Sequence, residues 1–323
     1  MESTLDLRAG ELVEVRSAAD ILATLDANGC LEGLPFMPEM AAMCGRQFRV
    51  YRRADKTCDT IKKPRSLKMD RTVHLESSRC DGAGHDGCQA GCLIFWKEAW
   101  LKRVPEGAAE TSAAASPELA ERLRRFAVTS DAEGPRYRCQ NTNLLDAAAP
   151  VSWWEPGQYL TELKTGNIGF GTWLVVLLRA GVGILRRKFV NRRHPFVYGN
   201  ASPTPTAKLG LQPGELVRIK SRKEIVATLD DRCKNRGLWF DIEQVPFCGG
   251  EYRVLKRVDR IVSEKTGRML HFKSDCIVLD GVFCKGEYAR ERLLCPRSIY
   301  PYWREIWLQR VEQAAPGAPP SVS

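Results

Sequence analysis

An internal repeat is the feature that most constrains this chain. When Gly10 is placed over Gly214, the sequence runs without a gap to Val50 over Val254, and 18 of the 41 aligned positions are identical. The register returns later, where WKEAWLKRV at 96–104 matches WREIWLQRV at 303–311. Each copy is about one hundred residues long, which is the size of a domain rather than of a solenoid unit. The sequence therefore predicts two tandem copies of one small fold.

The residue pattern within each copy is typical of a mainly β fold. The segments GELVEV and GELVRI alternate apolar and polar residues, as a half-buried strand does. Ser17 and Ser221 follow at positions typical of a helix N-cap. We expect further strands at FRVYRRAD and YRVLKRVD, and then at TVHLE and MLHFK. A small barrel that opens on such a strand resembles the SH3-like barrels in general shape. The expected fold is therefore mainly β (α+β), with two tandem SH3-like barrel-type repeats joined by a helical segment.

Changes in composition place the domain boundaries. After Val104 the sequence turns to Ala, Glu, Gly and Ser, which indicates a flexible exit from the first copy. NASPTPTAKLGLQPG has the composition of an extended linker, and EQAAPGAPPSVS that of a disordered tail. We expect a first repeat at 1–106, a connector with helices and a basic apolar segment at 107–207, a second repeat at 208–312 and a tail at 313–323.

The chain has 12 cysteines, and its N-terminus has neither the basic nor the apolar region of a secretory signal. We therefore expect a cytoplasmic protein, in which clustered cysteines indicate metal ligation or redox chemistry rather than disulfides. Thiolate and imidazole ligands favour zinc, and an iron–sulfur cluster is the alternative. The predicted metal ligands are Cys44, Cys80, His85, Cys88 and Cys92 in the first copy and Cys248, Cys276, Cys284 and Cys295 in the second.

Two alignments of the cysteine clusters remain open. Equal spacing matches Cys80 with Cys276 and Cys88 with Cys284. Matching the two Asp-Gly pairs instead places His85 over Cys284 and Cys88 over Cys295. An exchange of His for Cys is one that a zinc site tolerates, because imidazole and thiolate both bind zinc.

The remaining cysteines and histidines have other interpretations. Cys30 and Cys233 lack counterparts and are expected to be small buried hydrophobic residues. Cys139 lies outside the repeat, where it either completes the first site or stays unpaired. Cys58 is unmatched, like Cys92, and both are candidates for a reactive thiol. The histidines His74 and His271 are expected to be packed residues on a shared strand.

The usual catalytic signatures are absent from the sequence. It contains no G-x-S-x-G, no Walker-type phosphate loop and no H-E-x-x-H. Glu98 and Glu305 occupy matching places between two tryptophans. We expect these two carboxylates to be salt-bridged structural partners of Lys97 and Arg304, or of a neighbouring strand, rather than catalytic groups.

The positive charge is concentrated in the connector. The chain has a net charge of +10, yet no Asp or Glu lies between Leu163 and Gly214. The uninterrupted apolar part, 173–178, is far shorter than the roughly 20 residues that cross a bilayer. A helix here either packs between the two copies or lies at an anionic membrane surface. The residues that would contact such a surface, or nucleic acid, are Arg179, Arg186, Arg187, Lys188, Arg192 and Arg193.

Three classes of function follow from these features. The first is an intracellular metal-binding protein that acts as a non-catalytic scaffold or accessory component for a protein partner, with peripheral membrane contact as an option. The second is a nucleic-acid-binding tandem barrel, because basic strands recur with aromatic residues nearby. The third is a thiol- or metal-dependent enzyme with one working copy.

Overall fold

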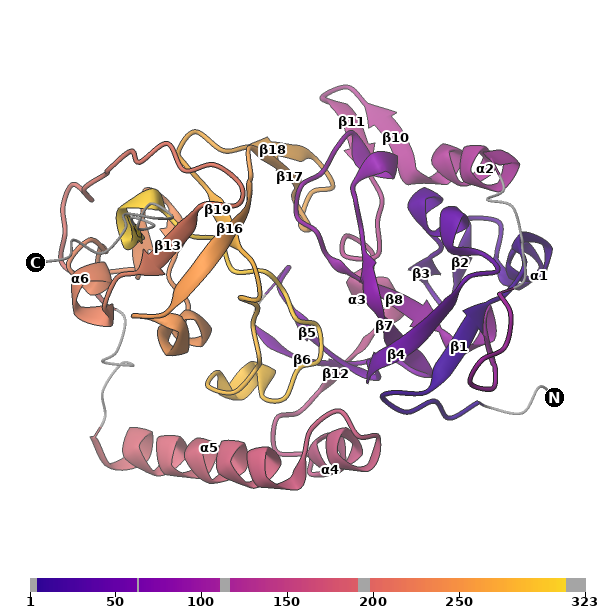
Figure 1. Cartoon of the computed structure of the whole chain (residues 1–323), viewed down its shortest axis with the longest axis horizontal. Coiled ribbons are helices and arrows are strands. Elements are labelled where there is room, and N and C mark those ends of the chain that lie inside the picture. Colours follow the sequence, from indigo (N-terminus) through magenta and orange to yellow (C-terminus); the bar gives the residue numbers. More distant parts are fainter. Residues whose placement is uncertain (1–4, 63, 111–116, 191–197, 312–323) are drawn as a thin grey trace, which may run out of the picture. The chain divides into compact units, whose positions relative to one another are not determined.

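The chain divides into two compact units that differ from the boundaries expected at 106, 207 and 312. The structure, a computed structural model, describes residues 5–62, 64–110, 117–190 and 198–311 (Figure 1). Unit 1 comprises Met1–Asn191, Arg260–His271 and Cys284–Ile299, and unit 2 comprises Arg192–Asp259, Phe272–Phe283 and Tyr300–Ser323. Two segments of the second copy thus belong to the unit that contains the first copy.

Unit 1 is built on a five-stranded antiparallel sheet that forms a half-barrel, so the expectation of a mainly β fold is confirmed. The strand order is β8-β7-β4-β1-β9. The bounds are β1 Leu12–Val15, β4 Gln47–Arg53, β7 Thr72–Arg79, β8 Leu93–Lys97 and β9 Leu101–Arg103. The apolar side chains of these strands form one buried core with the short helix α1 (Ala18–Thr24). Ser17 caps α1 as expected, accepting a hydrogen bond from the Asp20 amide at 3.2 Å.

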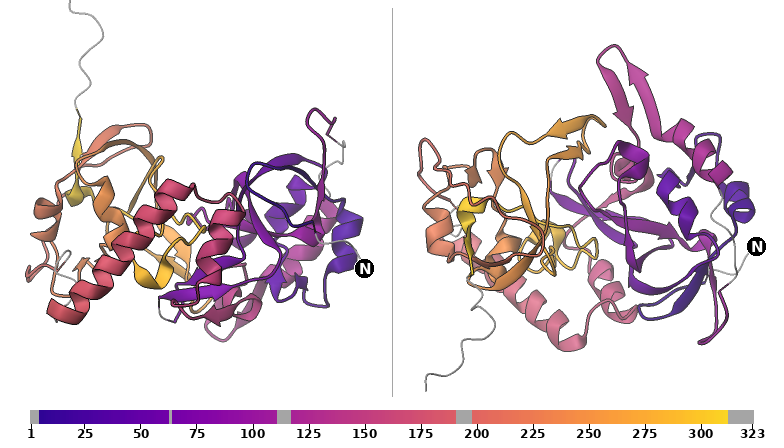
Figure 2. Two further views of the ribbon diagram at one scale, coloured as in Figure 1. Left: turned by 90° about the horizontal axis from the view of Figure 1, so that it is seen from below. Right: turned by 45° about the horizontal axis from the view of Figure 1, so that its top comes forward.

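Smaller elements complete unit 1. A second sheet has the order β12-β6-β5, and two hairpins, β10-β11 and β17-β18, stand apart from it (Figure 2). Their bounds are β5 Lys56–Asp59, β6 Arg65–Lys68, β10 Val128–Asp131, β11 Gly134–Tyr137, β12 Ala149–Val151, β17 Arg260–Val262 and β18 Met269–His271. The helical and short elements are β2 Cys30–Leu31, β3 Leu34–Pro35, η1 Pro38–Met43, η2 Ala83–His85, η3 Glu98–Trp100, α2 Pro117–Ala127, α3 Leu144–Ala147 and η5 Arg290–Arg292.

Unit 2 contains a four-stranded antiparallel sheet of order β19-β16-β13-β20. Ser221 caps its short helix α6 and forms a capping box with Glu224. The elements are β13 Leu216–Ile219, α6 Arg222–Val226, β14 Lys234–Asn235, β15 Leu238–Trp239, η4 Ile242–Phe247, β16 Glu251–Arg257, β19 Ile277–Leu279, η6 Glu305–Trp307 and β20 Leu308–Arg310.

The same internal contacts recur in the two units. Leu12 pairs with Arg49 between β1 and β4, and Leu216 pairs with Arg253 between β13 and β16. In each unit a tryptophan Nε1 donates to a threonine hydroxyl: Trp100 to Thr24 at 3.0 Å and Trp307 to Thr228 at 2.9 Å. Each tryptophan also lies edge-on to a phenylalanine, Phe36 or Phe240. The aligned residues therefore occupy equivalent core positions.

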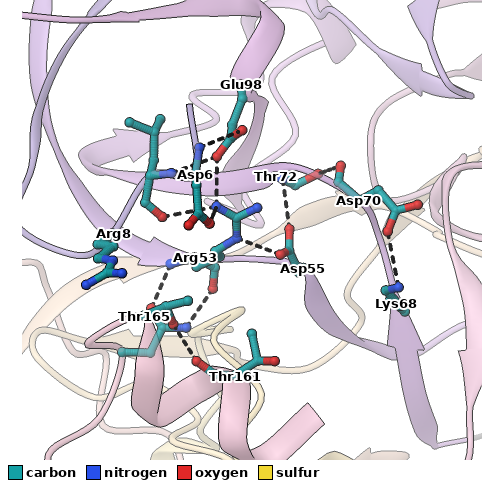
Figure 3. Close-up of polar contacts among 12 residues, drawn as sticks. Asp6, Arg8, Arg53, Asp55, Lys68, Asp70, Thr72, Glu98, Thr161 and Thr165 are labelled. Atoms are coloured by element: carbon teal, nitrogen blue, oxygen red, sulfur yellow. Dashed lines mark hydrogen bonds and ion pairs between the residues drawn. The ribbon is translucent and has the colours of Figure 1, made fainter. Parts of the chain in front are cut away.

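Glu98 and Glu305 are structural carboxylates, as expected, and each contacts an arginine of a neighbouring strand. Glu98 accepts hydrogen bonds from the Leu7 amide at 2.8 Å and from Arg53 at 2.7 Å (Figure 3). Glu305 accepts them from the Leu211 amide at 2.9 Å and from the guanidinium of Arg257. The partners are thus strand residues of β4 and β16 rather than the adjacent Lys97 and Arg304.

The strand expected at MLHFK is not the counterpart of TVHLE. The register pairs Val50 with Leu75 in unit 1 and Val254 with Leu279 in unit 2, so β7 corresponds to β19. MLHFK instead contributes β18, whose hairpin leaves the sheet between β16 and β19, just as β5-β6 leaves it between β4 and β7. His74 and His271 therefore do not share a strand position, because the counterpart of His74 in the register is Val278.

The connector contributes α2, the β10-β11 hairpin, α3 and β12 to unit 1, and its later part forms two further helices, α4 (Gly157–Lys164) and α5 (Phe170–Val190). One face of α5 packs against Leu293 and Leu294 through Val176. Figures 1 and 2 show α5 as one continuous helix. Among the described residues, no helix has the length and apolar character needed to span a membrane.

Candidate metal centre

Three side chains of different chemistry meet in unit 1. Glu39 lies in η1, Cys80 follows β7, and His85 ends η2, and their ligand atoms lie within 4.8 Å of one another. Cys80 Sγ donates to Glu39 Oε1 at 2.8 Å, and His85 Nδ1 lies 3.3 Å from the same oxygen. The other ring nitrogen of His85 faces the carbonyl oxygen of Arg138 at 3.1 Å. A sulfur, an imidazole nitrogen and a carboxylate oxygen thus converge on one point.

Two glycines make this convergence possible. Gly82 has a φ of +79°, which turns the chain between Cys80 and His85, and a Cβ there would lie 2.1 Å from the Cys88 carbonyl oxygen. Gly84 lies directly against Glu39, because a Cβ at this position would lie 2.7 Å from Glu39 Oε2. The Cys-Asp-Gly-Ala-Gly-His segment is therefore shaped to bring His85 back towards η1.

The centre is buried and electrically paired. The side chains of His85 and Glu39 are 2% and 3% exposed. Burial opposes ionisation of Glu39, but hydrogen bonding and charge from His85 outweigh it and lower the pKa of this carboxyl. Burial likewise opposes the charged form of His85, and Glu39 reverses that effect and raises the pKa of the imidazole. Burial and the charge of Glu39 both raise the pKa of Cys80, so the metal-free centre holds a neutral thiol beside an ion pair.

One oxygen of this centre has no hydrogen-bond partner. Within the described part of the chain, Glu39 Oε2 is fully buried and accepts no hydrogen bond. Buried carboxylate oxygens are almost always satisfied, because leaving one unpaired costs about 1–3 kcal/mol. A metal ion would satisfy this oxygen. The donor set of thiolate, imidazole and carboxylate is one that Zn²⁺ accepts.

Three further cysteines lie around Cys80. The Cys80 amide donates to the Cys92 carbonyl oxygen at 2.8 Å. Burial raises the pKa of Cys92, and the neighbouring thiols of Cys139 and Cys88 raise it further. Cys139 therefore folds back towards the first-copy cysteines, which was one of its two expected positions. Two of these sulfurs have a protein donor: Asn141 Nδ2 lies 2.8 Å from Cys92 Sγ, and the Val262 amide lies 3.3 Å from Cys88 Sγ.

The other predicted ligands lie elsewhere. Cys44 is part of the hydrophobic core of unit 1, and Cys248 packs against that of unit 2. Cys276 is buried in unit 2 beside β19. Cys284 and Cys295 lie in the 284–299 segment of unit 1. The structure does not bring these five cysteines into a group of three ligand atoms among the residues that it describes.

The strand registers decide between the two alignments of the clusters. The offset of 204 residues that relates β7 to β19 places Cys80 over Cys284. The backbone supports this match, because the Cys80 amide donates to the Cys92 carbonyl oxygen and the Cys284 amide donates to that of Ile299, each at 2.8 Å. Each acceptor lies four residues before the shared tryptophan. Trp96 pairs with Val73 as Trp303 pairs with Ile277, and this places Cys88 over Cys295. Only one match survives: the Asp-Gly alignment correctly placed Cys88 over Cys295, but its match of His85 with Cys284 was wrong because Cys284 corresponds to Cys80. Equal spacing was wrong for both pairs, because Cys276 corresponds to Thr72 and Cys284 to Cys80.

Sequence reasoning missed Glu39, although a signal for it was present. Glu39 and Glu243 are identical in the gapless alignment, and both side chains are buried. A buried acidic residue that recurs in both copies indicates a specific partner. The packed role expected for His74 is confirmed, since its ring is fully buried and its Nδ1 lies 2.8 Å from the Ile94 carbonyl oxygen. The packed role expected for His271 is wrong, because His271 is exposed at the end of β18.

Comparison with models of protein families, with curated proteins and with solved structures gives no match for this chain. The centre is therefore interpreted from its own geometry.

Proposed function

We propose that this protein binds a Zn²⁺ ion through Glu39, Cys80 and His85 and acts as a non-catalytic scaffold. The observation that carries this proposal is the buried Glu39 Oε2, which has no hydrogen-bond partner in the described chain and lies in a centre that also supplies a thiol and an imidazole. In this proposal the two copies are small barrels of the SH3-like type, and the ion fixes the loop after β7 of the first.

Metal binding at this centre is coupled to proton release. The metal-free centre holds the proton of the Cys80 thiol and the proton shared between His85 and Glu39. A thiolate and a neutral imidazole are the forms that bind zinc, so both protons must leave. Affinity for zinc should therefore fall as the pH is lowered.

The enclosure of the centre favours a structural role over a catalytic one. Structural zinc sites are closed by protein ligands, whereas catalytic sites keep a position open to solvent and substrate. The ligand side chains of His85 and Glu39 are 2% and 3% exposed. The thiol of Cys92, whose charge acts on Cys80, would serve as the fourth ligand after a rotamer change.

The proposal is tested by elemental analysis of full-length protein purified without oxygen. We expect about one zinc per chain, lost in Glu39→Gln and in Cys80→Ser and retained in the matched control Cys44→Ser. The control removes a thiol that lies in the hydrophobic core of the same unit. Wild-type protein without zinc would overturn the proposal. If the protein instead contained iron and absorbed broadly in the visible range, the centre would hold an iron–sulfur cluster rather than zinc.

A second function is favoured by the exposed face of α5. Six large apolar side chains on this helix are between 40% and 63% exposed: Phe170, Leu174, Val175, Leu178, Val182 and Leu185. Their spacing of three and four residues places them along one side of the helix. An apolar stripe of this size on a helix surface indicates an interaction site.

We propose that this stripe contacts an anionic lipid surface. The segment from Leu163 to Gly214 carries no Asp or Glu, so the helix and the sequence after it are purely basic. An apolar helix face with basic residues beside it binds anionic lipid at the interface. Of the expected basic contacts, Arg179 lies within 3.7 Å of Glu287, the side chains of Arg186, Arg187 and Lys188 are not described, and Arg192 and Arg193 lie outside the described residues.

Sedimentation with vesicles tests the lipid contact. Wild-type protein should bind phosphatidylserine-containing vesicles and lose this binding in Leu178→Glu, whereas Leu255→Glu, at an exposed apolar residue of unit 2, should bind normally. Equal binding to zwitterionic vesicles, concentration-dependent dimerisation lost in Leu178→Glu, or preferential binding to nucleic acid would each refute the assignment.

A further inference from the structure

The two copies exchange contacts through their hairpins within unit 1. The hairpin β17-β18 of the second copy reaches the first-copy cysteines, since the Val262 amide lies 3.3 Å from Cys88 Sγ. In return, the hairpin β5-β6 of the first copy reaches the 291–297 segment of the second. There the Cys58 and Cys295 side chains are in hydrogen-bond contact.

These two contacts are equivalent in the repeat. Cys88 corresponds to Cys295, as the strand pairing shows, and the offset of 204 residues places Cys58 over Val262. At equivalent positions of the fold, Cys88 of the first copy therefore faces a valine, Val262. Cys295 of the second copy instead faces a second cysteine, Cys58. Packing alone is satisfied by valine, so the second sulfur calls for a chemical explanation.

Hydrogen bonds on both sides hold the two sulfurs in place. Lys56 donates to the Leu293 carbonyl oxygen, and Ser66 Oγ donates to that of Glu291 at 3.2 Å. Arg297 Nη1 donates to the Cys58 carbonyl oxygen at 3.0 Å, and its Nη2 lies 2.8 Å from Glu264 Oε1. Both cysteines are buried, at 2% and 3% exposure. The pair is thus a rigid, preformed contact between β5 and the 291–297 segment.

The surroundings of the pair favour one thiolate and one thiol. The charged and titratable groups around the pair are Lys56 on β5, Arg292 and Arg297 on the 291–297 segment, and Cys284, which acts on Cys295. Glu162 on α4 acts on Lys56, and Glu264 lies beyond Arg297. The hydrogen bond from Cys295 outweighs burial and, together with the charges of Arg297 and Arg292, lowers the pKa of Cys58 to about 6. The same hydrogen bond and burial raise the pKa of Cys295. One proton is shared, and Cys295 holds it.

We infer that Cys58 and Cys295 are a redox-active pair that a small hydroperoxide converts to a disulfide joining the two copies. The Cys58 thiolate attacks the peroxide oxygen, the O–O bond breaks, and the alcohol or water leaves after taking up a proton from solvent, so that Cys58 becomes a sulfenic acid. Cys295 then attacks that sulfur, its thiol proton leaves with the hydroxyl group as water, and the S–S bond forms. The two sulfurs together lose two electrons, and the peroxide gains them.

A metal explains this pair less well than redox chemistry does. Tetrahedral zinc needs four ligands, and in the described chain no third ligand atom joins Cys58 and Cys295 in a group of the kind that Glu39, Cys80 and His85 form. The inference is independent of the zinc proposal, because the two sets share no residue.

The pair is tested by treating full-length reduced protein with limiting hydrogen peroxide and mapping disulfides by mass spectrometry of tryptic peptides. Trypsin places Cys58 in the peptide 57–62 and Cys295 in the peptide 293–297. We expect these two peptides to be joined before any other pair, and dithiothreitol to separate them. In Cys58→Ser, residue 295 should remain alkylatable, and in the matched control Cys30→Ser the crosslink should form as in wild type.

A pH profile separates this role from mere proximity. In wild type the crosslinking rate should be half-maximal near pH 6 and approach its full value about one pH unit higher. Arg297→Gln should move that midpoint upward by about one pH unit, because it removes a cation next to Cys58. A crosslink that never forms, oxidation of Cys58 to sulfinic acid without a crosslink, or loss of zinc in Cys58→Ser would overturn the inference. Loss of zinc in Cys80→Ser alone would leave it intact.

Discussion

Replacing Glu98 by Gln removes the carboxylate that faces Arg53 in the core of unit 1. The Arg53 side chain is 8% exposed and that of Glu98 is 4% exposed. Without Glu98 the guanidinium keeps Asp55, at 2.5 Å, and the exposed Asp6, at 3.3 Å. Breaking a buried ion pair costs about 3–5 kcal/mol. Because Asp55 still neutralises Arg53, we expect the lower end of that range, about 3 kcal/mol.

The repeat offers an internal comparison for this prediction. Glu305 accepts hydrogen bonds from three backbone amides, those of Leu209, Gly210 and Leu211, but its arginine partner, Arg257, is 31% exposed. A guanidinium that reaches water loses less when its partner is removed. Glu305→Gln should therefore cost about 1–2 kcal/mol, mainly through weaker charge-assisted hydrogen bonds.

Amide hydrogen exchange measures the stability loss of each variant at the affected site. It therefore avoids fitting a single unfolding transition to a protein that has two units. A cost of 3 kcal/mol corresponds to about 150-fold faster exchange of the Leu7 amide in Glu98→Gln. The Leu211 amide should speed up by roughly 5- to 30-fold in Glu305→Gln. If the two amides accelerate equally, the stranded charge of Arg53 is not the dominant cost and the reasoning fails.

Three further predictions concern unit 1. Burial lowers the pKa of His74 to about 3 from its ordinary value of 6.5, so the unfolded chain takes up this proton first as the pH falls. The wild-type protein should lose about 2 kcal/mol of stability between pH 6.5 and 4.5 through this residue. His74→Gln should flatten that part of the acid-unfolding curve measured by circular dichroism, and an unchanged curve would contradict the assignment. Gly84→Ala should displace Glu39 and lower zinc affinity about 10- to 100-fold in a chelator competition, whereas Gly181→Ala, whose added Cβ meets no atom within 4 Å, should not. Gly286→Ala should slow the peroxide crosslink, since its Cβ would lie 2.7 Å from the Cys295 amide nitrogen, and a normal rate would show that this loop adapts.

The repeat, the two helix caps and the structural role of Glu98 were predictable because each rests on local residue patterns. Ser17 and Ser221 precede short helices, and local hydrogen bonding decides where such helices begin. The sequence predicted only that the partner of Glu98 is a neighbouring lysine or a residue of a neighbouring strand. Only the sheet register identifies this partner as Arg53.

The cysteine pairing was not predictable from one sequence. The offset between the copies is 204 residues at Cys80 and 207 at Cys88, because the loop between the two cysteines is three residues longer in the second copy. A change of offset inside a loop leaves no residue pattern, so spacing alone misaligned Cys276. The contact of Cys58 with Cys295 spans most of the chain and depends on tertiary structure alone.

The exchange of hairpins has a consequence for how the protein is made. A ribosome releases the N-terminus first, and most domains fold as soon as they emerge. Here the unit that contains the first copy also includes 260–271 and 284–299, which are synthesised well after the first copy. During translation, Cys58 and Cys88 therefore remain without their native contacts until residues about two hundred positions downstream have been synthesised. A chain truncated after the first copy would leave these thiols without their native contacts.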